Sequence, residues 1–308
     1  MRKRTLPTTG LLRYCEYHIE KHVGDMIRPW MSFYKLLRMF EVYQSHISRR
    51  LMTDSFTKST IELFIKYLSQ EKNQKQTTIF NNFSKLKTLL YTCHADGYAV
   101  NISALKNSRI RRGESHAIFL TIEELQQIEK LELEGTKLYI RDLFLVSCYT
   151  GLRYTDLIRV NKQHVEGNFI KITPNKTLRS IFIPVHTVIA KILNQYEAQV
   201  PSYFTLSYFN ITIKHIASMA GISELISVPA KRGGKNVFID KPKWKLISSR
   251  TGRRSFATNM YLAHPIGSVY PIMQITGHET EESFFRYICV SKIENAVHLL
   301  ENHPFYQS

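Results

Sequence analysis

The chain has 308 residues, 44% of them hydrophobic, and a formal net charge of +17 at pH 7. The length suggests two domains of ordinary size, and the apolar content argues against a disordered protein. A positive excess this large favours a polyanionic partner, nucleic acid first, over a role in solubility alone. Residues 1–115 hold 20 of the 42 Lys and Arg but only 9 of the 25 Asp and Glu, so the N-terminal part is the more basic.

The chain shows no sign of a membrane or secretory segment. The basic start is not followed by an apolar run, and apolar stretches such as 143–149 are too short to cross a bilayer. We therefore expect a soluble, intracellular protein whose four scattered cysteines are reduced. Cys15, His18 and His22 share one helical face, but a structural zinc needs four ligands, so packing or DNA contact is favoured over a metal site.

From about residue 11 to residue 96 the apolar pattern is helical, and a small basic helical bundle is expected. The predicted apolar stripes consist of Ile61, Phe64, Ile65 and Leu68, and of Ile79, Phe83, Leu86 and Leu90. The following stretch, NSRIRRGESHAIF at 107–119, contains three arginines and no period, which predicts an inter-domain linker. Such a linker either lies along a phosphate backbone or is solvated.

A second domain begins at Thr121, which forms a capping-box pattern with Glu124 and predicts a helix start. An apolar helix then ends at Gly151. The runs NFIKIT and SIFIPV predict a β-hairpin with Lys176 near its tip. Helices are expected at about 186–197 and 207–220. A turn with one short strand is expected near 230–240, and the remainder is expected to be helical.

The stretch SSRTGRRSFATNMYLA predicts a helix from near Gly252. On it Arg253 shares the apolar face with Phe256, Ala257 and Met260, so its guanidinium points inward near the helix N-terminus. A buried guanidinium needs an anion. Two interpretations stay open, namely an anion-binding site and a structural arginine paired with a distant carboxylate.

The stretch TGLRYTDL places Arg153 directly after a helix break, with Asp156 three residues further on. Two interpretations are open. The two residues form a local ion pair, or Asp156 holds Arg153 so that its guanidinium faces a phosphate. Lys176 at a hairpin tip carries little information alone, because most such lysines are simply exposed.

Taken in order, these segments resemble the tyrosine recombinase family, the phage-type integrases. TGLRYTDL is similar to the first arginine box, Lys176 to the hairpin lysine, RTGRRSFAT to the His-x-x-Arg box, and TGHETEESFFRYI to the Gly-His box with its tyrosine nine residues on. The spacings agree over about residues 120–290. In these boxes the amino-acid sequence is most similar to that of integrases and invertases of Bacteroidetes mobile elements.

The resemblance implies a mainly α fold with small β-hairpins, arranged as a two-domain C-shaped DNA clamp. Residues 1–106 would form a helical, SAM-like core-binding domain, 107–119 a basic linker, and 120–308 an α+β catalytic domain with a C-terminal helix. The tail SKIENAVHLLENHPFY is an amphipathic pattern that would dock on a neighbouring protomer or pack on its own domain. The expected location is the bacterial cytoplasm, at the nucleoid.

The resemblance also implies a mechanism. Arg153 and Arg253 would clamp a phosphodiester, His278 would donate a hydrogen bond to it, and Lys176 would protonate the leaving 5′ oxygen. Tyr287 would hold the DNA as a 3′-phosphotyrosine, with neither metal nor ATP as cofactor. The implied partners are double-stranded DNA with specific recombination sites, a homotetramer on that DNA, and accessory bending or directionality factors. The expected DNA-contacting residues are Lys85, Lys87, Arg109, Arg111, Arg112 and Arg254.

One position departs from the family pattern. The box that begins with histidine in the family begins here with Arg250, and arginine cannot accept a proton near neutral pH. Arg250 can still donate to a phosphate or lower the pKa of Tyr287 by its charge. An active recombinase is the favoured interpretation. The alternatives are a catalytically impaired DNA-binding homologue, a type IB topoisomerase that relaxes DNA without site preference, and a basic RNA-binding or scaffold protein.

Overall fold

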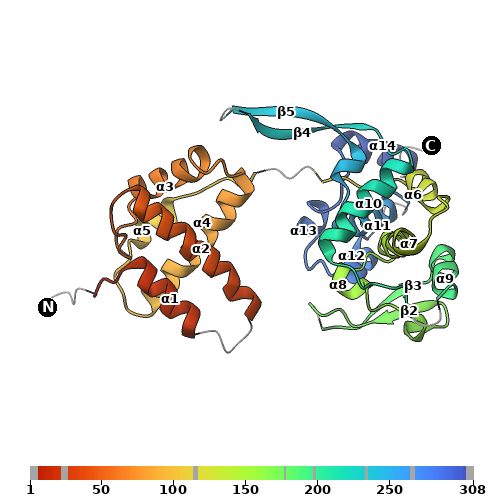
Figure 1. The fold of residues 1–308 in the computed structure, drawn as a ribbon, viewed down its shortest axis with the longest axis horizontal. Coiled ribbons are helices and arrows are strands. Elements are labelled where there is room, and N and C mark those ends of the chain that lie inside the picture. Colours follow the sequence, from red (N-terminus) through yellow and green to blue (C-terminus); the bar gives the residue numbers. More distant parts are fainter. Residues whose placement is uncertain are drawn as a thin grey trace. The chain divides into compact units, whose positions relative to one another are not determined.

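The computed structural model describes residues 6–21, 27–113, 117–176, 178–196, 199–232, 235–263 and 268–302. The chain divides into two compact units (Figure 1). The first comprises Met1–Ser115 with Pro229–Val237, and the second His116–Val228 with Phe238–Ser308. None of the helices in the described ranges has the length and apolar character that a membrane crossing requires.

The first unit is a helical bundle, as its sequence pattern predicts. Its helices are α1 (Leu11–Lys21), α2 (Ile27–His46), α3 (Lys58–Gln70), α4 (Gln76–Ala95) and α5 (Ile102–Asn107). Seven of the eight predicted stripe residues are buried in one core, and Ile65 is partly buried against it. Cys15 and His18 also lie in this interior, whereas His22 is outside the described residues. The Tyr14 hydroxyl donates to Asp96 at 2.6 Å and ties α1 to the end of α4.

The second unit is built around one central helix, α7. The helices are α6 (Ile122–Glu129), α7 (Gly135–Thr150), α8 (Tyr154–Leu157), η1 (Lys162–His164), α9 (Thr187–Asn194), α10 (Leu206–Met219), η2 (Lys243–Leu246), α11 (Ser249–Ala263), α12 (Tyr270–Thr276), α13 (Glu281–Phe285) and α14 (Lys292–Asn302). Helices α6, α8, α9, α10 and α11 pack against α7 (Figure 1). The predicted capping box is confirmed, because Thr121 and Glu124 exchange side-chain and backbone hydrogen bonds at the start of α6.

The predicted hairpin is confirmed and extended by a third strand. β1 (Val165–Glu166), β2 (Phe169–Ile172) and β3 (Ile181–Pro184) form one antiparallel sheet in sequence order. Ile170 pairs with Ile183, and both are buried in the core of the unit, while the alternate residues face outward. The connection between β2 and β3 carries Lys176.

The expectation of a turn and one short strand near 230–240 is wrong in extent. β4 (Leu225–Arg232) and β5 (Lys235–Pro242) pair as a two-stranded sheet of eight residues each. The β-branched residues that precede Pro229 and follow Lys235 continue the strands well beyond the Gly-rich turn.

The start of α11 also differs from the prediction. The helix begins at Ser249, three residues before the expected Gly252, so Arg253 lies one turn inside rather than at the N-terminus. The residue before the helix, Ser248, is bonded to its first turn, because the Ser248 backbone amide donates to the Thr251 hydroxyl at 2.9 Å. Phe256 and Ala257 are buried with Arg253, but Met260 at the end of the predicted apolar face is 39% exposed.

Candidate active site

Close packing of α7 against α11 builds the centre of the site. Gly151 ends α7 in the left-handed conformation, with φ +68°, as the sequence predicts for a helix stop. A Cβ atom at Gly151 would lie 2.5 Å from the ring of Phe256, and one at Gly252 would lie 2.7 Å from the Ser147 hydroxyl. The two glycines therefore let the helices approach closely and bring Arg253 next to the end of α7.

Arg253 is the charged centre of this packing. It is only 7% exposed, and its Nη1 donates to the Gly151 carbonyl at 2.6 Å. No carboxylate of the described residues lies within ion-pair distance of it. Burial, followed by the charge of Arg153, lowers the pKa of Arg253 to about 10, so the guanidinium remains charged at neutral pH.

Arg153 and Asp156 do not form the ion pair considered from the sequence. Arg153 is half-buried and precedes the first turn of α8. The buried carboxylate of Asp156 accepts from the Asn175 backbone amide at 2.9 Å and pairs with Arg159 at 3.8 Å. Asp156 therefore holds the β2–β3 connection at the residue before the exposed Lys176.

His278 follows Gly277, which ends α12 in the left-handed conformation. Its Nδ1 lies 2.8 Å from the hydroxyl of buried Thr276. Its ring lies 4.8 Å from that of Tyr287, centroid to centroid. Burial, followed by the charges of Arg253 and Arg153, lowers the pKa of His278 to about 4, so the free imidazole is neutral at pH 7.

Tyr287 lies at the edge of a small core formed by α11, α12 and α13, partly buried rather than enclosed. Burial raises its pKa, and the positive charges of Arg253, Arg254 and Arg153 act against that rise. The Arg254 guanidinium lies 5.4 Å from the centroid of the tyrosine ring. Arg254 was expected at a DNA surface, but here it is half-buried against Tyr287.

Four of the six expected catalytic residues, Arg153, Arg253, His278 and Tyr287, thus belong to one site. The rings of His278 and Tyr287 are in contact, and the two arginines shift the pKa values of both. Arg250 is exposed on the first turn of α11, and Lys176 is exposed beside the turn held by Asp156. Sequence reasoning missed Thr276, although its position two residues before His278 was the available signal.

The expected DNA-contacting residues of the first unit lie together around α4. The Lys87 ammonium donates to the Ser108 carbonyl at 3.3 Å, and the Gln76 amide donates to the Arg111 carbonyl at 2.9 Å. These bonds tie the start of the predicted linker to the helix. The side chains of Arg109, Arg111 and Arg112 in this tied segment are exposed, and those of Lys85 and Lys87 on α4 are half-exposed.

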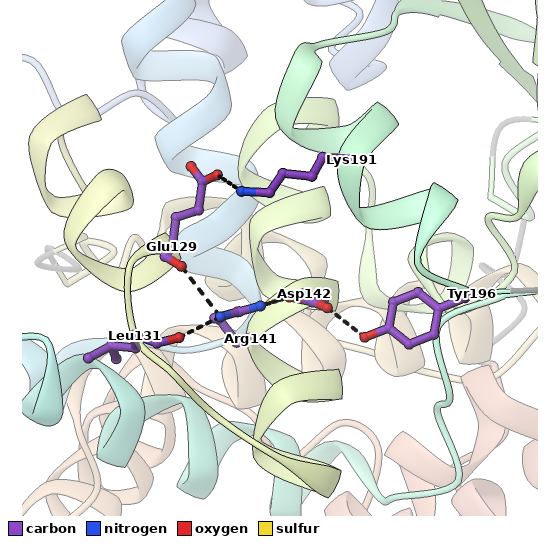
Figure 2. Close-up of polar contacts among 6 residues, drawn as sticks. All are labelled: Glu129, Leu131, Arg141, Asp142, Lys191 and Tyr196. Carbon is purple, nitrogen blue, oxygen red and sulfur yellow. Dashed lines mark hydrogen bonds and ion pairs between the residues drawn. The ribbon is translucent and has the colours of Figure 1, made fainter.

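A second polar cluster in the second unit involves none of the expected site residues (Figure 2). Arg141 forms an ion pair with buried Asp142 at 2.8 Å, and the Tyr196 hydroxyl donates to the other carboxylate oxygen at 2.5 Å. Lys191 pairs with Glu129 at 3.4 Å. The cluster lines a hollow of about 900 Å³ whose walls include none of the expected site residues. Elsewhere in the described ranges, no three His, Cys, Asp or Glu side chains are grouped to hold a metal ion.

Comparison with known proteins agrees with this organisation. A family model for the phage integrase SAM-like domain matches residues 10–107. None of the curated proteins matches the chain.

Three solved structures illustrate the likeness over both units. A Tn1549 transposon integrase in complex with a circular intermediate DNA has TM-score 0.72 and 14% identity, covering 96% of this chain and 99% of that one. A lambda integrase dimer bound to a core site has TM-score 0.67 and 14% identity, with coverages of 91% and 95%. The XerH site-specific recombinase bound to its palindromic substrate has TM-score 0.62 and 15% identity, with coverages of 94% and 85%.

These matches confirm the expected fold class, which is mainly helical with small antiparallel sheets. The family-model match applies to residues 10–107, and the likeness to solved structures shows the fold of both units. The chain therefore carries a phage integrase SAM-like domain at residues 10–107 and has the fold of the integrases and recombinases to which it is similar.

Proposed function

We propose that the chain is a site-specific DNA recombinase that cleaves and rejoins DNA through a 3′-phosphotyrosine on Tyr287. The observation that carries this proposal is Arg253, a buried guanidinium that has no acidic partner among the described residues and lies beside Arg153, His278 and Tyr287. A charge buried without a partner is costly unless a ligand supplies the opposite charge. A DNA phosphate is the anion that this basic chain would meet.

Each residue has a definite role in the proposed reaction. Arg153 and Arg253 bind the non-bridging oxygens of the phosphodiester and disperse the charge that develops in the transition state. The phenolate oxygen of Tyr287 attacks phosphorus, the bond to the 5′ oxygen breaks, and Lys176 gives that oxygen its proton. The energy of the phosphodiester is conserved in the phosphotyrosine, so the reversal that rejoins the strand needs no cofactor.

The two units divide the work in this proposal. We assign residues 1–106 to core-site binding, 107–119 to a basic linker and 120–308 to catalysis. The SAM-like match over 10–107 and the DNA-bound state of the similar integrases support that division. Double-stranded DNA is the partner, and the arrangement of the two recombination sites decides between integration, excision and inversion.

Helix α14 supports assembly of several protomers on DNA. One side of it packs on its own unit, where His298 is buried and the Tyr261 hydroxyl donates to Asn295 at 2.5 Å. Its other side exposes an apolar stripe of Ile293, Val297 and Leu300, which are 76%, 43% and 59% exposed. This stripe is suited to dock on a neighbouring protomer of a homotetramer.

The test is a search for the covalent intermediate. The protein is incubated with DNA from its own genomic neighbourhood, denatured in detergent and digested, and the peptides are examined by mass spectrometry. We expect a nucleotide attached to Tyr287, and no such adduct in the Tyr287→Phe variant.

The same experiment separates the alternative functions. Tight DNA binding without an adduct would favour a catalytically impaired binder, with Arg250 as the cause. Adducts on any DNA, together with relaxation of plasmids that lack a special site, would favour a topoisomerase.

A further inference from the structure

The identity of the base that takes the proton of Tyr287 is open in this chain. The position where the family has histidine is Arg250, whose guanidinium has no lone pair to offer near neutral pH. A phenol must lose its proton to attack phosphorus, and burial raises the pKa of Tyr287, which makes that loss harder. Another acceptor, either a side chain of the site or a water molecule, therefore has to take the proton.

The hydrogen bonds of Thr276 fix the proton on the His278 ring. The Thr276 hydroxyl has one hydrogen, and it donates this hydrogen to the Ile272 carbonyl at 2.7 Å, which can only accept. The 2.8 Å contact between the same hydroxyl oxygen and His278 Nδ1 is open to either donor. While the hydroxyl keeps its hydrogen on the carbonyl, the imidazole has to be the donor, so the proton of the neutral ring is on Nδ1 and Nε2 carries the lone pair.

The surroundings of His278 keep this lone pair available. Burial, followed by the positive charges of Arg253 on α11 and Arg153 before α8, lowers the pKa of the ring. Phe284 from α13 contacts it edge-on at 5.7 Å, and Tyr287 contacts it at 4.8 Å with the two planes 49° apart.

The phenol is held on the arginine side. The guanidinium of Arg253 acts on Tyr287 electrostatically, and a guanidinium can only donate a hydrogen bond. A bond from Arg253 would therefore be accepted by the phenol oxygen, which would keep its own hydrogen to give away.

We propose that His278 Nε2 accepts the phenolic proton of Tyr287, and that Thr276 is the positioning residue that holds the ring in the required tautomer. This inference rests on the proposed function. In the step, the phenol O–H bond breaks, its proton moves to Nε2, and the phenol oxygen bonds to phosphorus. The bond to the 5′ oxygen breaks, and that oxygen takes a proton from Lys176. The imidazolium returns the proton when the strand is rejoined.

Substrate binding makes His278 a better base. Two arginines lower its affinity for protons in the free protein, and a phosphate clamped between them would offset their charge. The basicity of His278 then rises only when the DNA is in place. This dependence prevents Tyr287 from losing its proton to His278 before DNA is bound.

The competing role for His278 is the hydrogen-bond donor to the phosphate that the family resemblance implies. That role needs a proton on Nε2, which the Thr276 bond disfavours in the neutral ring. Glutamine separates the two roles, because its amide can donate a hydrogen bond but cannot take a proton.

The first experiment reads the tautomer directly and needs no activity. The full-length chain is labelled with ¹⁵N-histidine, and His278→Gln identifies the resonance. We expect an Nδ1-protonated neutral ring in the free protein, and a mixed or inverted tautomer in Thr276→Val. Thr92→Val is the matched control, because the Thr92 hydroxyl makes the same bond to the carbonyl four residues earlier, on an exposed helix. An Nε2-protonated ring in the wild type would overturn the inference.

The second experiment measures single-turnover formation of the Tyr287 adduct against pH, on DNA that the wild type cleaves. General-base catalysis typically contributes about 10²- to 10⁴-fold, so we expect a loss of that order in His278→Gln. The remaining rate should rise with pH, as hydroxide replaces the base. Added imidazole should partly restore His278→Ala. In Thr276→Val the rate of adduct formation should fall about tenfold, because the ring then also adopts the Nε2-protonated tautomer, which cannot accept the proton. In Thr92→Val the rate should not change.

The outcomes distinguish this inference from the proposed function. If the wild type forms the adduct and His278→Gln matches it at every pH, His278 is not the base, although the recombinase assignment stands. If the wild type forms no adduct, the recombinase assignment fails, while the tautomer measurement still reports on Thr276.

Discussion

The two units of the molecule bury different kinds of side chain. Among the described residues of the first unit, the buried polar side chains are His18 and Thr53, and the core is otherwise aromatic and aliphatic. Among its described residues, the second unit buries four charged side chains, namely Asp142, Asp156, Lys243 and Arg253, with a larger set of hydroxyl groups. Since a buried charge does not stabilise a fold unless it is paired, each of the four needs an account of its partner.

The four buried charges separate into two groups. Asp142 is paired with Arg141 (Figure 2), Asp156 with Arg159, and Lys243 with Glu124 at 2.8 Å. Among the described residues, Arg253 donates to the Gly151 carbonyl and has no acidic partner. We infer that the paired charges stabilise the fold of the unit, whereas Arg253 binds an anionic ligand.

The largest expected effect is that of Arg253→Met. Loss of one charge-stabilising donor typically costs about 10²- to 10³-fold in rate, so adduct formation should fall at least that far. The free energy of unfolding should change little or increase, because the variant removes a buried charge that has no acidic partner. Single-turnover cleavage and urea unfolding measure the two quantities. A loss of stability without a loss of cleavage would show that Arg253 is structural.

The matched change, Arg141→Met, should have the opposite profile. It leaves the buried Asp142 carboxylate without its cation, which typically costs about 3–5 kcal/mol of stability. Cleavage per folded molecule should remain at the wild-type level, since the cluster shares no residue with the expected site. Arg38→Met removes an exposed pair with Glu41 and serves as the control, with an expected cost of about 0–1 kcal/mol. Equal costs at Arg141 and Arg38 would show that the buried Arg141–Asp142 pair matters no more for stability than an exposed pair.

Local signals made much of the fold predictable from the sequence. The stripe that includes Phe64 and the one that includes Leu86 are buried as the helical period requires. The capping box at Thr121 and the left-handed Gly151 are decided by neighbours within a few residues. Such features depend on short-range geometry that a periodic sequence records directly.

The details of the site depend on distant partners, and the sequence does not record them. Asp156 bonds the backbone of Asn175, 19 residues away, rather than the nearby Arg153. Arg254, which was expected to contact DNA, lies over the ring of Tyr287, 33 residues further along the chain. The role of Thr276 becomes visible only when both of its hydrogen bonds are known.

Asp156→Ala tests whether a paired buried charge also serves the chemistry. Without the bond to the Asn175 amide, the connection that carries Lys176 should loosen. Misplacement of a catalytic group by about 1 Å can cost about 10²-fold, and we expect a loss of up to that size. The loss should disappear on a substrate with sulfur in place of the 5′ oxygen, because a thiolate leaves without an acid.

Lys176→Met should show the same dependence on the leaving group. Glu166→Ala breaks an exposed ion pair with Lys171 in the same sheet, and it should leave the cleavage rate on both substrates unchanged. An equal loss on both substrates would mean that Asp156 acts on folding or on the phosphate clamp rather than through Lys176.

The smallest expected effect is that of Arg250→His. Arg250 is exposed on the first turn of α11, so its replacement should not disturb the core. We expect the cleavage rate to stay the same or to rise by up to about tenfold, because a histidine there adds a second group able to accept a proton. A large loss of activity would instead show that Arg250 has its own role at the phosphate.

The combination with His278→Gln makes this small effect decisive. If His278 is the base, a histidine at position 250 should restore much of the cleavage that His278→Gln removes, because the proton again has an acceptor. If His278 only donates to the phosphate, a base elsewhere cannot replace the donor, and the two changes should act independently. The gain from Arg250→His would thus be small in the wild type and large in the His278→Gln background. That difference would show that a proton acceptor, rather than another positive charge, is what the arginine at this position leaves missing.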